Sequence, residues 1–197
     1  IGEKLGRRTL YRVARDFGFG TRTGVALPGE TAGRLKSPSA RDWYGTTTAM
    51  MSFGQEIGAT ALQIVTAYSA VANGGTLHEP LMIREIRGRD GRVMQRGSPS
   101  VIRRVVRPAT AATLRVLLEK VVQDGTGVKA RVPGYRVAGK TCTAQKLEPG
   151  KGVRAYSSTR YTASFCGFIP AEHPRATILV VLDEPADMDP RAWPEVI

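Results

Sequence analysis

The chain has few of the residues that build metal sites and redox pairs. Its 197 residues include only two cysteines and two histidines. Cys142 and Cys166 form no CxxC motif and have no Cys/His ligand spacing. His78 and His173 each lie close to a proline in a segment expected to be a loop. The sequence therefore predicts no zinc site and no other metal site.

Long apolar runs and interleaved aromatic residues are also absent. No run approaches the roughly 18 apolar residues that cross a bilayer, and the start does not look like a signal peptide. With 29 Lys plus Arg against 17 Asp plus Glu, the net charge of +12 favours contact with polyanions. The arginines occur in short groups without the aromatic residues on which bases stack, so we expect no nucleic-acid partner.

The composition, 42% hydrophobic and 23% charged, is that of a globular protein, and we expect a single domain over residues 1–197. A first amphipathic helix is predicted around residues 10–17, ending at Gly18 as a left-handed cap. The stretch from there to Asp42 is rich in Gly, Pro, Ser and Thr. It is expected to be an ordered loop with one short strand at residues 25–27.

Two more helices follow, separated by a hairpin. "TALQIVTAYSAVANGG" has Thr60 and Gln63 in capping-box spacing and is apolar on nearly every side, which predicts a buried helix. An exposed hairpin is predicted around Asp90 and Gly91. The next helix has Pro108 at its first position and is expected to bury one apolar face. That face comprises Leu114, Leu117, Leu118, Val121 and Val122.

The last third of the chain changes to the period of β-strands. Strands are predicted at residues 135–145, 161–169 and 177–182, with the first two forming an antiparallel hairpin whose polar loop overhangs its end. Because helices come first and strands last, the fold class expected is α+β, with a sheet layered against helices.

Four sequence blocks, in this order, carry a family resemblance: "FGFGTRTGVALPGETAG", "MSFGQEIGATALQIVTAYSAVANGG", "VVQDGTGVKA" and "YRVAGKTCTAQK". Together they resemble the transpeptidase domain of class B penicillin-binding proteins, the division and sporulation type. The resemblance implies the penicillin-binding protein and serine β-lactamase fold, an antiparallel sheet sandwiched by helices. This chain would supply three C-terminal strands plus helices.

The resemblance also implies a reaction. In this family a serine of an SxxK motif attacks the D-Ala-D-Ala end of a peptidoglycan stem peptide, and an amine of a neighbouring stem peptide takes up the acyl group. An SxN motif completes the proton network, and a Lys-Thr-Gly strand flanks the pocket. Penicillins and other β-lactams acylate the same serine. This chemistry needs no metal and no organic cofactor.

The Lys-Thr-Gly strand is the one motif that carries over residue by residue. Lys140 and Thr141 match its first two places, and Thr143 matches the hydroxyl residue that follows. Lys140 would supply positive charge for the substrate carboxylate, and the backbone N–H of Thr143 would be one oxyanion-hole donor. Thr141 and Thr143 would point to one side of the strand, where their hydroxyls would hold a ligand carboxylate, and Lys140 and Cys142 would point to the other. The resemblance implies that Thr141, Cys142 and Thr143 form the substrate-binding stretch.

The nucleophile is not found in this chain. No serine is followed three positions later by lysine, and no SxN is present. Thr126 and Lys129 have the right spacing, but they lie in a Gly-flanked turn. We therefore expect a C-terminal part of the domain, truncated at both ends, with a closing helix missing after the last strand. Taken alone, it is expected to expose apolar surface, to be marginally stable and to be catalytically inactive.

Cys142 departs from the family, which has glycine at this place. Three interpretations stay open: a tolerated substitution, a weakened or inactive site, or a disulfide with Cys166. In a hairpin centred near Arg154 the two cysteines would lie almost opposite each other. We favour the tolerated substitution, because a register shifted by one residue would put the sulfurs on opposite faces.

A competing interpretation is a phosphate-binding loop, since "GYRVAGKT" fits its pattern literally. The residues after it are β-like and then loop, without the helix whose N-terminus would face phosphate. We therefore favour the transpeptidase hypothesis. The alternatives are a serine β-lactamase or β-lactam sensor of the same fold, and a degenerate, non-enzymatic cell-wall scaffold. The full-length parent would be membrane-anchored, with this domain extracytoplasmic or periplasmic. Its partners would be stem peptides, β-lactams and membrane proteins of division or elongation.

Overall fold

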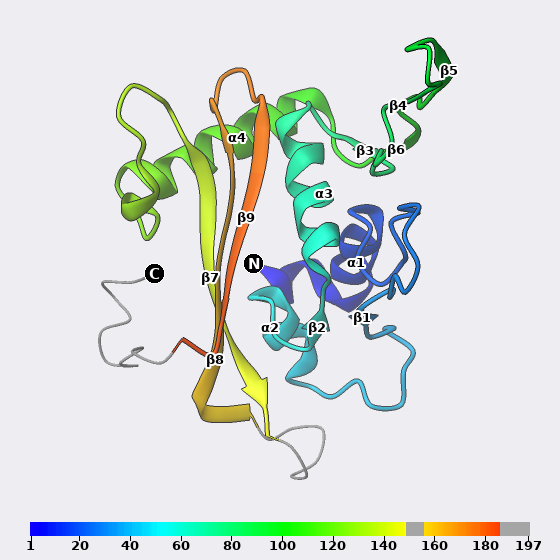
Figure 1. The fold of residues 1–197 in the computed structure, drawn as a ribbon. Helices are drawn as coiled ribbons and strands as arrows, with labels where there is room; N and C mark the ends of the chain where they lie inside the picture. The colour runs from blue at the N-terminus through cyan, green and yellow to red at the C-terminus, as the bar shows by residue number, and fades with distance from the viewer. Residues whose placement is uncertain (149–155, 186–197) are drawn as a thin grey trace. The chain divides into compact units, whose positions relative to one another are not determined.

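The computed structural model describes residues 1–148 and 156–185 (Figure 1). The chain divides into two compact units, Ile1–Pro108 and Ala109–Ile197. The expected single partial domain over residues 1–197 stays a prediction. The expected loop end at residues 149–155 and the expected lack of a closing helix after residue 185 lie outside the described residues.

The first helix of the first unit, α1 (Gly2–Asp16), ends as its sequence predicts. Gly18 has a φ of 97°, and its N–H donates to the carbonyl of Arg15 at 3.0 Å. Within α1 the backbone leaves helical geometry at Gly6, which produces a kink. A short helix that the sequence analysis did not anticipate, α2 (Thr47–Ser52), precedes the central helix.

Helix α3 (Ala61–Ala72) is the central helix of this unit, and its capping box is confirmed. The Thr60 hydroxyl accepts from the Gln63 N–H at 3.1 Å, while the Gln63 side-chain oxygen accepts from the Thr60 N–H at 2.9 Å. The helix ends at Asn73, and Gly74 and Gly75 follow with φ values of 88° and 104°. Because its buried residues are mostly alanine, the surrounding backbone can approach α3 closely.

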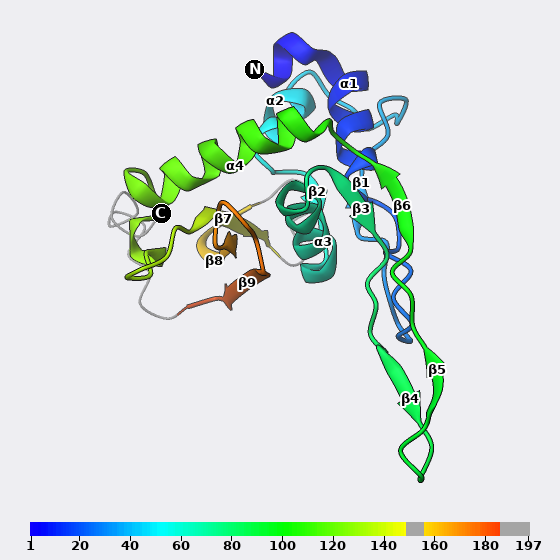
Figure 2. The same cartoon turned by 90° about the horizontal axis from the view of Figure 1, so that it is seen from above.

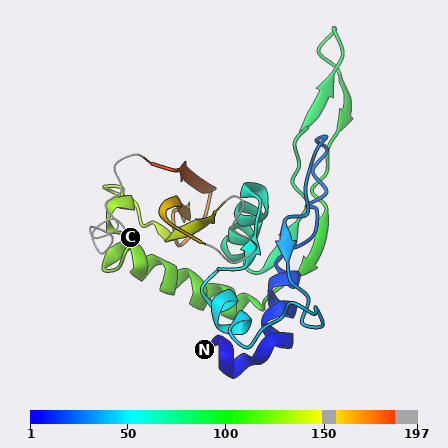
Figure 3. The same cartoon turned by 90° about the horizontal axis from the view of Figure 1, so that it is seen from below.

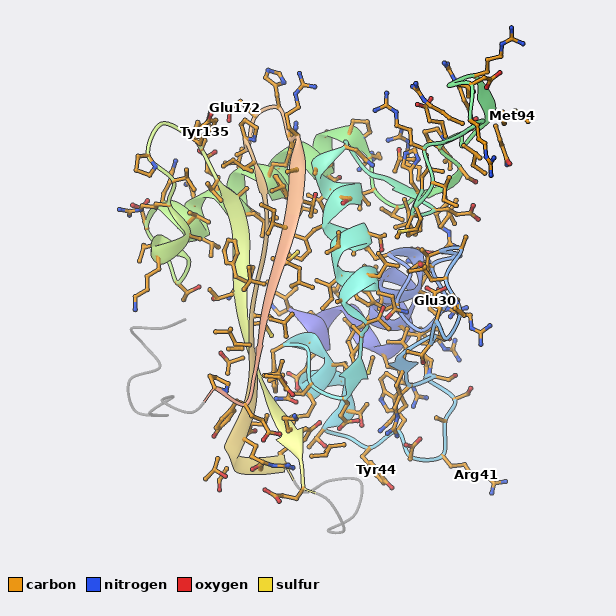
Figure 4. The ribbon with its side chains drawn as sticks, viewed as in Figure 1. Glu30, Arg41, Tyr44, Met94, Tyr135 and Glu172 are labelled. Carbon is orange, nitrogen blue, oxygen red and sulfur yellow. The ribbon has the colours of Figure 1, made fainter. Side chains whose placement is uncertain are left out.

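The loop after α1 contains no strand at residues 25–27, so that prediction is wrong. The N–H of Leu27 bonds instead to the carbonyl of Val25 at 2.8 Å, which is a tight turn. Glu30 orders the loop, because its carboxylate accepts from the N–H and the hydroxyl of Thr23, both at 2.6 Å (Figure 4). These bonds, the Thr23 hydroxyl first, lower the pKa of Glu30. The short strand lies further on, at β1 (Arg34–Leu35).

The strands of the first unit form three antiparallel pairs. β1 pairs with β2 (Ile57–Gly58), and β3 (Thr76–His78) pairs with β6 (Val101–Arg104). Beyond β3 and β6 the chain continues into the predicted hairpin, β4 (Glu85–Arg87) and β5 (Val93–Arg96), which turns at Asp90 and Gly91. Figure 2 shows this hairpin extending past β3 and β6.

The second unit begins with the predicted helix, α4 (Pro108–Gln123), followed by a short 3-10 turn, η1 (Val128–Ala130). Its buried side chains are Ala111, Glu119 and Val122. Leu117, expected on the buried face, is 54% exposed. Val122 is buried and Leu114, Leu118 and Val121 are half-buried, so the predicted face is confirmed except at Leu117.

The three predicted strands form one antiparallel sheet in the order β7-β8-β9. β7 (Ala138–Leu147), β8 (Tyr156–Ile169) and β9 (Ala176–Asp183) lie within a few residues of the expected bounds, except that β8 begins earlier. Figures 1 and 2 together place α4 across one face of this sheet. Phe168 and Ala138, 1% and 0% exposed, are buried where β7 and β8 pair.

The α+β prediction is confirmed, and every strand pair in the described residues is antiparallel. Figure 3 shows the same elements from below, opposite to the view of Figure 2. No helix among the residues that the structure describes has the length and apolar character needed to span a bilayer.

Candidate functional site

The candidate site is the middle of β7, where the sequence places a lysine and two threonines in an alternating strand. Thr141 pairs across the sheet with Phe165 and Thr143 with Ala163. Lys140 and Cys142 alternate with them and pair with Cys166 and Ser164 (also on β8). The strand therefore has the alternation that the sequence predicts.

The ammonium group of Lys140 nevertheless lies with Thr141. Its Nζ donates to the carbonyl oxygen of Thr141 at 2.8 Å and to the Thr141 Oγ1 at 3.3 Å. The four-carbon stem is long enough to fold back over the strand, so alternation of Cβ positions does not separate the charge from the hydroxyl. Lys140 is exposed, and Thr141 is half-buried.

Thr126 also belongs to this site, although the sequence indicated it only through its spacing to Lys129 and not as a partner of β7. The Thr141 hydroxyl donates to the Thr126 hydroxyl, with the two Oγ1 atoms 2.9 Å apart. The polar groups thus form a chain from Lys140 Nζ through Thr141 Oγ1 to Thr126 Oγ1. The available signal was the "GTG" triplet directly after α4.

Two glycines bring Thr126 to β7. The N–H of Gly127 donates to the carbonyl of Val121 at 2.9 Å, closing a tight turn at the end of α4. A Cβ added at Gly125 or Gly127 would stand 3.0 or 3.1 Å from that carbonyl oxygen. Side chains at these two positions would therefore press on the helix end and displace Thr126.

β7 is an edge strand of its sheet. The order β7-β8-β9 pairs one side of β7 with β8, and no described strand pairs with the other side. An open edge presents unpaired backbone N–H and C=O groups, which can bind an extended peptide as an additional strand. Charge, hydroxyls and an open backbone edge therefore occur on the same stretch of chain.

The two cysteines do not form the disulfide considered above, and both are free. Cys142 lies opposite Ser164, and Cys166 lies opposite Lys140, so the pairing is offset by two residues from the register that a disulfide requires. Diagonal neighbours of this kind have Cα atoms about 7–8 Å apart, beyond the usual disulfide span. Burial raises the pKa of the Cys166 thiol to about 12.

Cys142 does not distort the strand that contains it. β7 and β8 pair residue by residue from Ala138 to Gln145, and the one irregularity comes after that, between Gln145 and Leu147. The side chain at 142 is exposed. The backbone thus accommodates cysteine at the glycine position of the motif.

An ion pair supports the start of β7. Arg136 donates through Nε and Nη2 to the two carboxylate oxygens of Glu119, at 2.5 and 2.6 Å. These hydrogen bonds lower the pKa of Glu119, although its burial acts in the opposite direction. The Arg136 carbonyl also accepts from the N–H of Ala171, just after β8. Together these contacts fix the segment that leads into Lys140.

Three carboxylates elsewhere in the described residues are engaged by lysines. Asp183 and Glu184, at the end of β9, both bond Lys146, at 3.0 and 2.6 Å. In the first unit, Glu56 accepts from Lys36 at 2.7 Å and holds the loop before α3. In the described part of the chain no group of three metal-ligating side chains occurs.

The chain matches the penicillin binding protein transpeptidase domain over residues 1–193, and it belongs to that family. Two curated relatives are the penicillin-binding protein PbpB of Mycobacterium tuberculosis, 40% identical, and the stage V sporulation protein D of Bacillus subtilis, 41% identical. Each alignment covers 94% of this chain and 28% of the relative, so the chain spans little more than a quarter of their length.

Solved structures give the same result. Penicillin binding protein 3 of M. tuberculosis in complex with ampicillin superposes with a TM-score of 0.85 at 40% identity, covering 93% of this chain and 41% of that one. The transpeptidase domain of Burkholderia pseudomallei penicillin-binding protein 3 gives 0.76 at 33% identity, covering 96% and 53%. The expected resemblance to class B penicillin-binding proteins is confirmed by these relatives.

Proposed function

We propose that this chain forms part of a peptidoglycan D,D-transpeptidase, which crosslinks stem peptides through a serine acyl-enzyme and is acylated by penicillin. The observation that carries the proposal is the open edge of β7, with Lys140 and Thr141 at its centre. Membership of the transpeptidase family supports it.

Residues 140–143 of β7 each have a role in this reaction. The ammonium of Lys140 attracts the terminal carboxylate of D-Ala-D-Ala. When this substrate binds, the Thr141 hydroxyl turns its proton from Thr126 to the carboxylate, and the Thr126 hydroxyl donates to Thr141 in return. The backbone N–H of Thr143 stabilises the oxyanion that forms when the serine attacks the scissile carbonyl. Residues 141–143 line the substrate, with Cys142 at the glycine place.

Acyl transfer needs a nucleophile that this chain does not contain. The serine oxygen forms an ester with the penultimate D-Ala, and the terminal D-Ala leaves with a proton on its nitrogen. An amine of a second stem peptide then breaks that ester. Because no serine here is followed three positions later by lysine, we expect no acylation of the 197 residues alone.

The setting follows from the same chemistry. Stem peptides lie outside the cytoplasmic membrane, so the domain acts in an extracytoplasmic or periplasmic space on a membrane-anchored parent. Its β-lactam ligands resemble the D-Ala-D-Ala end. Membrane proteins of division or elongation are its expected partners.

Cys142 favours a second function, that of a cell-wall scaffold with a degenerate site. At position 142, between Thr141 and Thr143, this chain has a cysteine side chain where the family has glycine. The same fold also serves β-lactamases and β-lactam sensors, which turn over or retain the acyl group at different rates.

The test is acylation of the full-length gene product by fluorescent penicillin, followed by denaturing electrophoresis. If the protein is a transpeptidase, the wild type should give a labelled band. Lys140→Ala should label about a hundredfold more slowly, since losing a charge-assisted contact with the substrate carboxylate costs up to about 3 kcal/mol. Labelling by neither the wild type nor Cys142→Gly supports the scaffold. Rapid release of hydrolysed penicillin supports the β-lactamase.

A further inference from the structure

The hairpin of the first unit has a surface that the transpeptidase reaction does not use. We name residues 81–97, which contain β4 and β5, the arginine hairpin. It has five arginines against two carboxylates and no lysine, tyrosine, phenylalanine or tryptophan. Figure 2 shows it extending beyond β3 and β6, and Figure 4 labels Met94, which is 73% exposed.

Exposed apolar side chains accompany the arginines. The large apolar residues of the hairpin that face solvent are Leu81, Met82, Ile83, Ile86, Val93 and Met94. A two-stranded hairpin without a packed face is marginally stable in water. Arginine and methionine are enriched in protein interfaces, whereas lysine is depleted there. This composition is therefore that of an interface.

Internal ion pairs leave two of the arginines available. Arg87 and Arg96 share Glu85, and Arg92 pairs with Asp90. Arg84 and Arg89 have no ion pair among the residues that the structure describes. Arg84 directly precedes β4, Arg89 follows it by two positions, and Ile86 between them is exposed. β4 pairs only with β5 in this region, so its second edge is open.

These observations select one class of partner. A bilayer-binding segment would place aromatic residues at the headgroup level, and a nucleic-acid site would stack bases on them, but the hairpin has no aromatic residue. An open strand edge binds an extended protein segment through backbone hydrogen bonds. The guanidinium groups near the two ends of β4 can each form bidentate hydrogen bonds with a carboxylate.

We propose that the arginine hairpin is a docking surface for an acidic, extended segment of a partner protein. The segment adds a strand to the open edge of β4, its carboxylates pair with Arg84 and Arg89, and an apolar side chain covers Ile86.

The test uses the full-length gene product and a fluorescent strand-length peptide in which Glu and Val alternate. We expect binding in fluorescence anisotropy that the double variant Arg84→Glu/Arg89→Glu weakens about tenfold or more, the loss that two charge-assisted contacts imply. The matched control is Arg7→Glu/Arg8→Glu on the exposed surface of α1, which changes the net charge equally. It should bind the peptide as the wild type does.

Three results would overturn the docking surface. Equal weakening by both double variants, or equal binding of polyglutamate, means a general attraction of polyanions. Binding of phosphatidylglycerol vesicles that is lost in Arg84→Glu/Arg89→Glu, with no binding of the peptide, means a lipid surface. A peptide that binds equally well to Ile86→Asp means that the β4 edge is not its site.

Discussion

The hydroxyl groups of Thr126 and Thr141 are joined by a hydrogen bond of 2.9 Å, which links the turn after α4 to the centre of β7. Thr141 itself receives a hydrogen bond from Lys140. A hydroxyl that donates in a fixed direction and accepts from a lysine has a defined rotamer, so Thr126 determines how Thr141 presents its oxygen.

We therefore expect Thr126 to be a positioning residue for the proposed reaction. Thr126→Val removes the hydroxyl that holds Thr141 in place but keeps the shape of the side chain. Acylation of the full-length gene product by fluorescent penicillin should therefore slow about fivefold to tenfold, the value of one hydrogen bond. Thr126→Ser keeps the acceptor and should react at the wild-type rate. Equal slowing in both variants would assign the effect to packing and not to the hydroxyl.

The cysteines should differ sharply in reactivity. Cys142 is exposed, whereas Cys166 is 3% exposed and burial raises the pKa of its thiol to about 12. Only the thiolate is nucleophilic, so at neutral pH iodoacetamide should modify Cys142 alone in the folded protein and both cysteines in urea. Mass spectrometry of the tryptic peptides reads this out. Modification of Cys166 in the folded state would contradict its burial, and a Cys142–Cys166 disulfide would contradict the β7–β8 register.

The sequence predicts some elements of this fold well because their signals are local. The capping box at Thr60 and Gln63, the stop at Gly18 and the turn at Asp90 and Gly91 each depend on residues a few positions apart. The site strand was found because a motif of consecutive residues, from Lys140 onward, carries it.

What the sequence did not predict depends on contacts between distant segments. The hydroxyls of Thr126 and Thr141 are in contact only because the turn at the end of α4 lies beside β7. The register that offsets Cys142 from Cys166 is set by all the residue pairs of β7 and β8. The short strand falls at β1 and not at residues 25–27, because its partner β2 lies more than twenty residues away. Propensity within a window contains none of this information.

Gln63 should be the most sensitive polar residue of the first unit. Its side chain is 1% exposed, and its Nε2 donates to the carbonyls of Thr21 and Ala32 at 2.7 and 2.8 Å. Gln63→Leu keeps the volume but leaves these carbonyls and the Thr60 N–H without their partner. We expect a loss of about 3 kcal/mol in the free energy of unfolding, measured by urea titration.

The matched control for that variant is Gln95→Leu, the same substitution at an exposed position of β5. It should change the free energy of unfolding by less than about 0.5 kcal/mol, as surface substitutions generally do. Equal effects at the two positions would show that the α3 capping box and its loop contacts do not stabilise the unit.

The ion pair of Arg136 and Glu119 should make the second unit sensitive to acid. Glu119 is 5% exposed, and the Arg136 hydrogen bonds hold its pKa below the ordinary glutamate value. A carboxylate whose pKa is lower in the folded state stabilises the protein above its unfolded pKa, and this contribution disappears as the pH falls through the folded pKa. Arg136→Met should therefore lower the urea midpoint at neutral pH, and the gap to the wild type should narrow at acidic pH.

Two further variants separate the ion pair from other effects. Arg115 lies on α4 and donates a single hydrogen bond to the Glu172 carbonyl at 3.3 Å. Arg115→Met removes this bond and should lower the urea midpoint less than Arg136→Met does. The double variant Arg136→Met/Glu119→Leu replaces the pair with apolar side chains and should recover much of the lost stability, because no buried charge is left unpaired. If the double variant is no more stable than Arg136→Met, the cost comes from the lost arginine packing and not from the carboxylate it leaves behind.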